Sequence, residues 1–317
     1  MKKNFFILSI LSILLFSISC SLLKKEPSEN SIYILDWEKE AVYTVDSLFK
    51  LKTTPLLTTG TAPTDIYVDE NNIYITNSGF GGVPSIEKYD ISGNKIAQIE
   101  RGDLSSPAYI DGNENYIFVT DWLSNSFLKI EKSSFSIVDS ISLTAPQEVV
   151  YKDGFLYVGS NNTSLTGHIY KISEDFKNVE TDLSKGSNPS YLDIDDDNNI
   201  YVSLVGNYDD IKGKIKKIKN GVDLDSLSFE TYLGKVKVVE DKIFLTDIFS
   251  KLYILDKDLN ILNTINIPSP SDIEYFKGKI VVSTNVGKIY LVDFSELTLY
   301  DSLDYEIPLK VAEMFVK

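Results

Sequence analysis

Short runs of β-branched and aromatic residues alternate with polar loops along most of the chain. A run of the Ile-Tyr-Val type returns seven times and begins at Ile32, Ile73, Ile117, Leu156, Ile200, Ile243 and Ile280. Brief apolar runs bounded by Gly, Asn and Asp are typical of β-strands. Because these runs are continuously apolar, where a half-exposed strand would alternate, we expect both faces of each strand to be buried.

Successive copies of the run start 41, 44, 39, 44, 43 and 37 residues apart, which is the period of a four-stranded propeller blade. A proline keeps the same spacing ahead of a further strand in six repeats, at Pro63, Pro107, Pro146, Pro189, Pro270 and Pro308. Leu233 takes the equivalent place in the remaining repeat. The sequence therefore predicts an all-β fold over residues 31–317, a seven-bladed β-propeller of four-stranded antiparallel blades.

The two ends of the repeat region predict how the ring closes. The chain begins in the middle of a blade, with the strand near Ile32, and it finishes on a strand led by Pro308 that runs to Val316. We expect this C-terminal strand to pair as the innermost strand of the N-terminal blade. Such pairing would close the ring and remove its free edges.

The first residues of the chain have the layout of a secretory signal. In residues 1–19, two lysines precede an apolar run over 5–16 that is too short to span a bilayer comfortably. Cys20, the only cysteine, follows, and this arrangement resembles a bacterial lipobox, although Ser17 stands where such motifs usually carry Leu. The resemblance implies a lipid on Cys20, a polar tether over 20–30, and anchoring to the bacterial cell envelope at the outer membrane or the periplasmic or extracellular face. A cleaved, unlipidated signal is the alternative, and either signal exports the protein.

The charge of the chain bears on its partners. The formal net charge is −15, with 31 basic and 46 acidic residues and a single histidine. An acidic surface repels phosphates, so we expect no nucleic-acid partner. The lone His168 excludes mechanisms that need two or more histidines, and we interpret it as an ordinary structural residue.

In a propeller, the loop after each Ile-Tyr-Val strand lies on one face of the disc, which we call the loop face. We expect ligand-binding residues there because exposed aromatic rings beside Asp and Asn suit carbohydrate stacking or a protein interface. The alternative is that the Asp and Asn cap their own turns and each Trp covers a seam between blades. The candidates are Asp36, Trp37, Asn77, Phe80, Asp121, Trp122, Asp247 and Phe249.

A second set of candidates stands two residues beyond the start of each proline-led strand. These residues should ring the mouth of the central channel, and they are Asp65, Tyr109, Glu148, Tyr191, Lys235, Asp272 and Lys310. The carboxylates of Asp65, Glu148 and Asp272 could hold a calcium ion, which takes several oxygen ligands in a flexible site. The two lysines argue for the alternative, a water-filled channel in which they neutralise these acids.

One repeat resembles a known family closely. Ile73-Tyr74-Ile75-Thr76-Asn77-Ser78-Gly79, followed by Ile86-Glu87-Lys88-Tyr89-Asp90 and Pro107, is similar to the YVTN type of β-propeller repeat found in YncE-like proteins. The resemblance covers about residues 31–317. It implies the propeller fold but no particular ligand, because such propellers share a frame and differ in what they bind.

No nucleophile elbow, phosphate-binding loop, haem motif or histidine cluster occurs in the sequence. We therefore expect a non-catalytic binding or scaffolding module without a cofactor, whose partner is a glycan or an envelope protein. One alternative is a lactonase or hydrolase similar to the gluconolactonase and regucalcin class, which would use the carboxylates at the channel to hold a divalent cation such as calcium. Another is a structural subunit of an envelope assembly.

Overall fold

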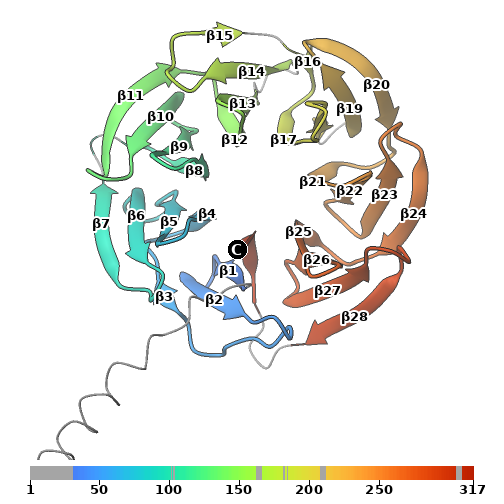
Figure 1. The fold of residues 1–317 in the computed structure, drawn as a ribbon, viewed down its shortest axis with the longest axis horizontal. Coiled ribbons are helices and arrows are strands. Elements are labelled where there is room, and N and C mark those ends of the chain that lie inside the picture. Colours follow the sequence, from blue (N-terminus) through green and yellow to red (C-terminus); the bar gives the residue numbers. More distant parts are fainter. Residues whose placement is uncertain are drawn as a thin grey trace, which may run out of the picture.

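The computed structural model describes residues 31–100, 102, 104–161, 166–180, 183, 185–207, 212–304 and 309–317. The described strands form seven antiparallel sheets that follow one another around a common axis (Figure 1). The predicted seven-bladed propeller is therefore confirmed. The predicted signal, the lipidation residue Cys20 and the tether over 20–30 lie outside the described residues.

Each blade places one strand next to the axis. Six of these innermost strands begin a blade in chain order, and the seventh comes from the C-terminus. Their side chains form the centre of the disc, so they decide what the axis can do. The innermost strands are β29 (Val311–Val316) in blade 1, β4 (Pro63–Val68) in blade 2, β8 (Pro107–Gly112) in blade 3, β12 (Pro146–Lys152) in blade 4, β17 (Pro189–Ile194) in blade 5, β21 (Leu233–Val239) in blade 6 and β25 (Pro270–Phe276) in blade 7.

The second strand of each blade is the Ile-Tyr-Val run. In β1 and β18, every residue is buried, as expected for strands that are covered on both faces by neighbouring blades. These strands are β1 (Ile32–Asp36), β5 (Asn72–Asn77), β9 (Tyr116–Asp121), β13 (Phe155–Ser160), β18 (Ile200–Leu204), β22 (Lys242–Asp247) and β26 (Lys279–Thr284).

The two outer strands of each blade become more polar toward the rim. The third strands are β2 (Ala41–Val45), β6 (Ser85–Asp90), β10 (Ser126–Glu131), β14 (Gly167–Ser173), β19 (Lys214–Lys219), β23 (Lys251–Asp256) and β27 (Lys288–Asp293). The outermost strands are β3 (Leu57–Thr58), β7 (Lys95–Glu100), β11 (Ser136–Ser142), β15 (Val179–Glu180), β20 (Val222–Ser228), β24 (Ile261–Asn266) and β28 (Leu299–Asp304), and β16 (Lys185–Gly186) also pairs with β14. In the part of the chain described, no helix is long and apolar enough to cross a membrane.

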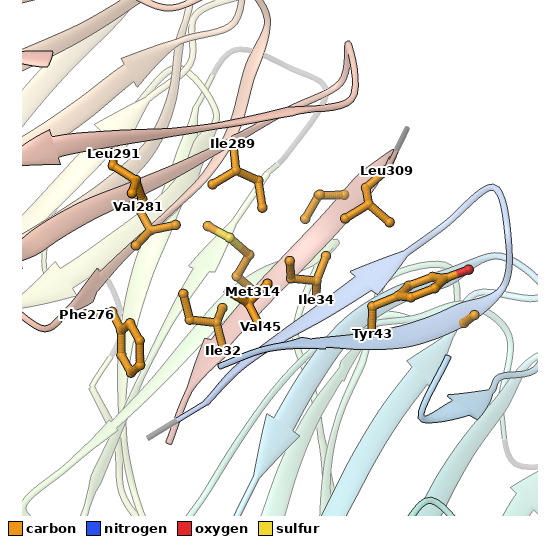
Figure 2. Close-up of a cluster of buried hydrophobic side chains, with 12 residues drawn as sticks. Ile32, Ile34, Tyr43, Val45, Phe276, Val281, Ile289, Leu291, Leu309 and Met314 are labelled. Atoms are coloured by element: carbon orange, nitrogen blue, oxygen red, sulfur yellow. The ribbon is translucent and has the colours of Figure 1, made fainter. Parts of the chain in front are cut away.

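The hydrophobic core is divided among the seams between blades. Each of the seven clusters of buried apolar side chains joins two neighbouring blades. Figure 2 shows the seam where the ring closes: Met314 of β29 lies among Ile32 and Ile34 of blade 1, facing Val281 and Ile289 of blade 7. Since a single blade cannot bury both of its faces, stability depends on all the seams being formed.

Ring closure occurs as the sequence predicts. Strand β29 pairs antiparallel with β1, with Ile34 opposite Met314. The register differs from the expected one, however, because Asp36 pairs with Val311, whereas its counterpart Asn77 in blade 2 pairs with Pro63. Val311, and not Pro308, therefore takes the place of the leading proline, and every assignment on this strand moves three residues along the chain.

Candidate functional site

The loop face is built by one backbone contact that repeats in all seven blades. The residue after each second strand donates its N–H to the carbonyl of the residue ahead of an innermost strand. This contact joins the two segments that the sequence analysis placed on one face. The pairs are Trp37 with Lys310, Ser78 with Ala62, Trp122 with Ser106, Asn161 with Ala145, Val205 with Asn188, Ile248 with Tyr232 and Asn285 with Ser269.

The polar candidates on the loop face serve the fold. Asp36, Asn77, Asp121 and Asp247 are all buried. Asp36 accepts hydrogen bonds from the N–H groups of two following residues at 3.0 and 2.9 Å, and Asp247 from three following N–H groups at 2.6 to 3.0 Å. Asp121 accepts two N–H groups at 2.7 Å, and the Asn77 amide donates to the Ser85 hydroxyl at 3.0 Å. Asp36 and Asp247 therefore cap their own turns, which is the alternative that the sequence left open, whereas Asp121 holds the segment ahead of β8 and Asn77 bonds to β6. The burial of all four side chains removes them from a ligand surface.

The aromatic candidates behave differently, because all four project into solvent. The exposed fractions are 45% for Trp37, 89% for Phe80, 43% for Trp122 and 57% for Phe249. Each follows the end of a second strand, so all four lie on the loop face. Trp37 also carries a cation over its ring, since Lys310 Nζ lies 5.6 Å from the ring centroid.

Six of the seven predicted channel residues come together around the axis, and the seventh does not. Lys310 instead lies at the surface, where its ammonium pairs with Glu38 at 2.8 Å. The register shift in β29 gives its place to Glu313, which the sequence analysis missed. We call the observed set the axial ring: Asp65, Tyr109, Glu148, Tyr191, Lys235, Asp272 and Glu313.

Lys235 connects the axial ring across the disc. Its Nζ lies 2.7 Å from Glu148 Oε1 in blade 4 and 2.8 Å from Glu313 Oε1 in blade 1. It also lies 5.2 Å from the ring centroid of Tyr191 and 5.8 Å from that of Tyr109. Burial alone would lower the pKa of Lys235, but the surrounding carboxylates outweigh it and hold this pKa well above its ordinary value. Lys235 is therefore a permanent ammonium at the centre of the ring.

The carboxylates of the ring are buried with too little positive charge around them. Burial raises the pKa of Asp65 to about 8, with Lys235 opposing the shift. Burial and the nearby Asp272 raise the pKa of Glu313 well above its ordinary value, and burial also raises that of Glu148. The ring thus holds four carboxylates against one ammonium, and it retains protons at a pH where exposed acids have lost them.

Most of these carboxylates also join neighbouring blades. Asp65 accepts the N–H of Ile110 in the next blade at 2.8 Å, and Glu148 accepts the N–H of Leu192 at 2.7 Å. Asp272 accepts the N–H of Met314 at 2.7 Å, which fastens the last blade to the closing strand. These bonds satisfy the carboxylates and fix the angle between innermost strands.

A second layer lies two residues further along the innermost strands, and the sequence analysis missed it. Asp111 accepts the N–H of Tyr151 and Asp193 accepts the N–H of Val238, each at 2.7 Å. Lys237 pairs with Glu274 at 2.9 Å. Period-two alternation along a strand could have identified these positions, since residues two apart point to the same side.

The calcium alternative is not supported by this arrangement. Oxygens of Asp65, Glu148 and Asp272 are bonded to backbone N–H groups, and Glu148 is bonded to Lys235 as well. Within the described ranges, no three or more His, Cys, Asp or Glu side chains are grouped so that they could hold a metal ion. Lys235 Nζ already lies between Glu148 and Glu313, where a metal ion would have to lie.

A pocket of about 330 Å³ opens on the loop-face side of the axial ring. Its floor includes Lys235 and Glu313, and its walls carry the aromatic rings of Trp37, Tyr109 and Tyr191. Small residues keep it open, among them those at the start of the innermost strands. The described lining residues come from six blades, blades 1 to 3 and 5 to 7. The structure thus combines members of both predicted sets, one from the loop face and three from the channel, in one site that we call the mouth pocket.

Comparison with known proteins identifies the fold and no family. No protein-family model and no curated protein matches the chain. Among solved structures, it is similar to a functionally unknown protein from Desulfotomaculum acetoxidans DSM 771, with a TM-score of 0.72 and 12% identity over 91% of this chain and 99% of the other. It is also similar to the C-terminal WD40 domain of Sif2, with a TM-score of 0.65 and 13% identity over 89% and 86% of the two chains. At such identities the likeness shows the β-propeller fold alone.

Proposed function

We propose that this protein is a non-catalytic binding module whose ligand enters the mouth pocket from the loop face. The observation that carries the proposal is the pocket itself, which has aromatic walls and a charged floor and stands at the one point that almost all the blades share. Its volume falls within the range of small-molecule sites. The ionisable groups on its floor bond to one another, which suits them to binding more than to proton transfer.

We also propose that the module works outside the cytoplasm, anchored through a lipid on Cys20. The signal-like residues 1–19 and the position of Cys20 support this proposal. Strand β1 runs from Ile32 toward the loop face, and the carbonyl of Ser31 at its other end accepts the N–H of Lys317. Residue 31, where the described part of the chain begins, therefore lies on the face opposite the mouth pocket. A Cys20→Ser variant is expected to leave the membrane fraction, and its retention there would refute the anchor.

A protein partner is the second candidate, favoured by apolar side chains on the loop face outside the pocket. Phe80 is 89% exposed, Leu123 61% and Phe249 57%. Large exposed side chains of this kind mark interaction surfaces when they gather on one face. Such a role would suit a scaffold in the cell envelope, and the resemblance of the repeat to the YVTN type of YncE-like proteins is compatible with either candidate.

The proposed function is tested by filling the pocket. Ala108 lines it, so an Ala108→Phe substitution should occupy the space that a ligand needs. Ligand-observed NMR with a library of cationic, anionic and neutral fragments should find compounds that bind the natural protein and do not bind this variant. Trp122→Ala, an exposed residue that does not line the pocket, is the matched control and should keep the same binders.

Two results would contradict the proposal. One is a set of binders that is unchanged by Ala108→Phe, and the other is a library without binders. If Ala108→Phe disturbs folding, Trp37→Ala replaces it, because it removes a wall of the pocket from an exposed position.

A further inference from the structure

We propose that the ligand of the mouth pocket is a small organic cation, an alkylammonium group on a short apolar body. This inference rests on the proposed function, because it names the chemical class of the ligand for the same pocket. Three independent features carry it: the aromatic walls, an ammonium already bound in the floor, and a shortage of positive charge around the axis.

The aromatic side chains in the pocket walls can bind a cation through their ring faces. Trp37, Tyr109 and Tyr191 line the pocket, and the two tyrosine rings meet edge to face with centroids 6.3 Å apart. The face of an aromatic ring attracts a cation, and sets of such rings bind quaternary ammonium ligands. Lys310 Nζ already lies 5.6 Å from the Trp37 centroid.

The floor shows that this environment accepts an ammonium. Lys235 Nζ sits between the carboxylates of Glu148 and Glu313 and lies within 6 Å of both tyrosine centroids. Three of the side chains that contact this internal ammonium, Glu313, Tyr109 and Tyr191, also line the pocket. A ligand cation would bind in the same way, on the loop-face side of Lys235.

The charges of the axial ring also favour a cation as the ligand. Four carboxylates of the axial ring face one ammonium, and Glu313 is the one among them that lines the pocket. Burial and the nearby Asp272 raise the pKa of Glu313, which favours a proton on its carboxyl group in the free protein. A bound ligand cation would replace such a proton.

The groups that interact with Glu313 are Asp65 on β4, Tyr191 on β17, Lys235 on β21 and Asp272 on β25. Glu148 on β12 shares Lys235 with it, and Tyr109 on β8 lines the same pocket. The pKa values of Asp65 and Glu148 are raised as well, so ionisation of the ring increases as the pH rises. Affinity for a cation should therefore increase from pH 6 to pH 9, with release of protons on binding.

The test uses choline as the probe and 3,3-dimethyl-1-butanol as its neutral counterpart of nearly the same shape. Isothermal titration at fixed ionic strength should show choline binding at least about tenfold more tightly than the alcohol. Glu313→Gln and Trp37→Ala should each weaken choline binding about tenfold or more, and Trp122→Ala should leave it unchanged.

Lys235→Met gives the sharpest discrimination. It vacates the internal ammonium site and leaves the carboxylates without their partner, so choline should bind this variant more tightly than the natural protein and raise its melting temperature more. If Lys235 served only to stabilise the fold, the Lys235→Met variant would be less stable, and choline would not restore its stability. Glu313→Gln and Trp37→Ala still decide the question if Lys235→Met does not fold.

Equal affinity for choline and the alcohol, or choline binding that is insensitive to Trp37→Ala and Glu313→Gln, would overturn the inference. These results would leave untouched the proposed function, which is that the pocket binds a ligand. If neutral or anionic fragments bind the pocket and Ala108→Phe displaces them, the pocket is a ligand site and only the cationic class is wrong. If no fragment depends on the pocket, the proposed function itself falls.

Discussion

Two opposing influences act on the buried carboxylates of the innermost strands. Hydrogen bonds from backbone N–H groups favour the ionised form, whereas burial favours the neutral form. Asp65 accepts the N–H groups of Ile66 and Ile110, and yet its pKa is raised to about 8. Asp111 also accepts two N–H groups, and burial still raises its pKa to about 6. Burial is the stronger influence at both residues.

This balance predicts how stability depends on pH. An Asp whose folded pKa is raised binds protons in the native state between its ordinary pKa, near 3.8, and the raised value. The native state then binds more protons than the unfolded state, so the free energy of unfolding decreases as pH rises through this window. We expect the protein to lose about 2 kcal/mol or more between pH 5 and pH 8, measured by urea unfolding at each pH.

An Asp65→Asn variant checks the assignment. Asn does not titrate, so the decrease in stability between pH 5 and pH 8 should become smaller. A natural protein that is more stable at pH 8 than at pH 5 would contradict the prediction. Carboxylates with lowered pKa values, such as the half-buried Asp69, cannot offset the decrease, because their contribution to stability is already complete at pH 5 and is lost only at lower pH.

The sequence predicted the place of some site residues correctly and missed others. Lys235 was placed correctly without a leading proline, because the Ile243 run fixes the spacing of its blade. Glu313 was missed because Pro308 suggested a register that the pairing of Asp36 with Val311 excludes. The capping role of Asp247 depends on local turn geometry, and the same residue type after a strand also fits a ligand surface.

At the scale of elements, strands were predictable and the segments joining them were less so. Continuous apolar runs identified the second strands because burial on both faces leaves no other pattern. The residue ahead of several leading prolines instead adopts a left-handed conformation, with φ of 54° at Ala62 and 58° at Asn188. The usual preference before proline is extended. Tertiary contacts on the loop face, including the bonds these residues accept, override that preference.

The closing strand gives a prediction at this scale. Met314 is 1% exposed and packs at the seam between blades 1 and 7. Met314→Ala should lower the free energy of unfolding by about 2–5 kcal/mol, because it leaves a cavity in the seam. Phe249→Ala, at an exposed position, should change it by about 0.5 kcal/mol or less. Urea unfolding measures both.

Removing the last strand should have a larger effect. A chain that ends before Leu309 loses the inner partner of β1 and the N–H that Asp272 accepts. It should lose its single cooperative unfolding transition. A truncated protein with the melting transition of the natural chain would refute the role of β29 in closing the ring.

The whole molecule links ring closure to the site. The mouth pocket takes its lining from six of the seven blades, so it exists only when the ring is closed. Repeat spacing was enough to predict seven blades and a shared axis. It was not enough to predict the pocket, because the small residues that keep it open and the position of Glu313 depend on the register of each innermost strand.

Closure and binding should therefore be coupled. A ligand that binds only the native state raises the free energy of unfolding by RT ln(1 + [L]/Kd), which is about 2.7 kcal/mol at a hundred times Kd. Since the pocket belongs to no single blade, this increase in the free energy of unfolding should appear in the unfolding of the entire disc. The increase should be greatest at high pH, where more carboxyl groups of the axial ring are ionised.

A crystal structure of the natural protein with choline at pH 8 tests the central claim most directly. We predict a closed ring of seven blades with the trimethylammonium group beside the rings of Trp37, Tyr109 and Tyr191, on the loop-face side of Lys235. Choline bound elsewhere, a mouth pocket without choline at saturating concentration, or a disc with another number of blades would contradict it.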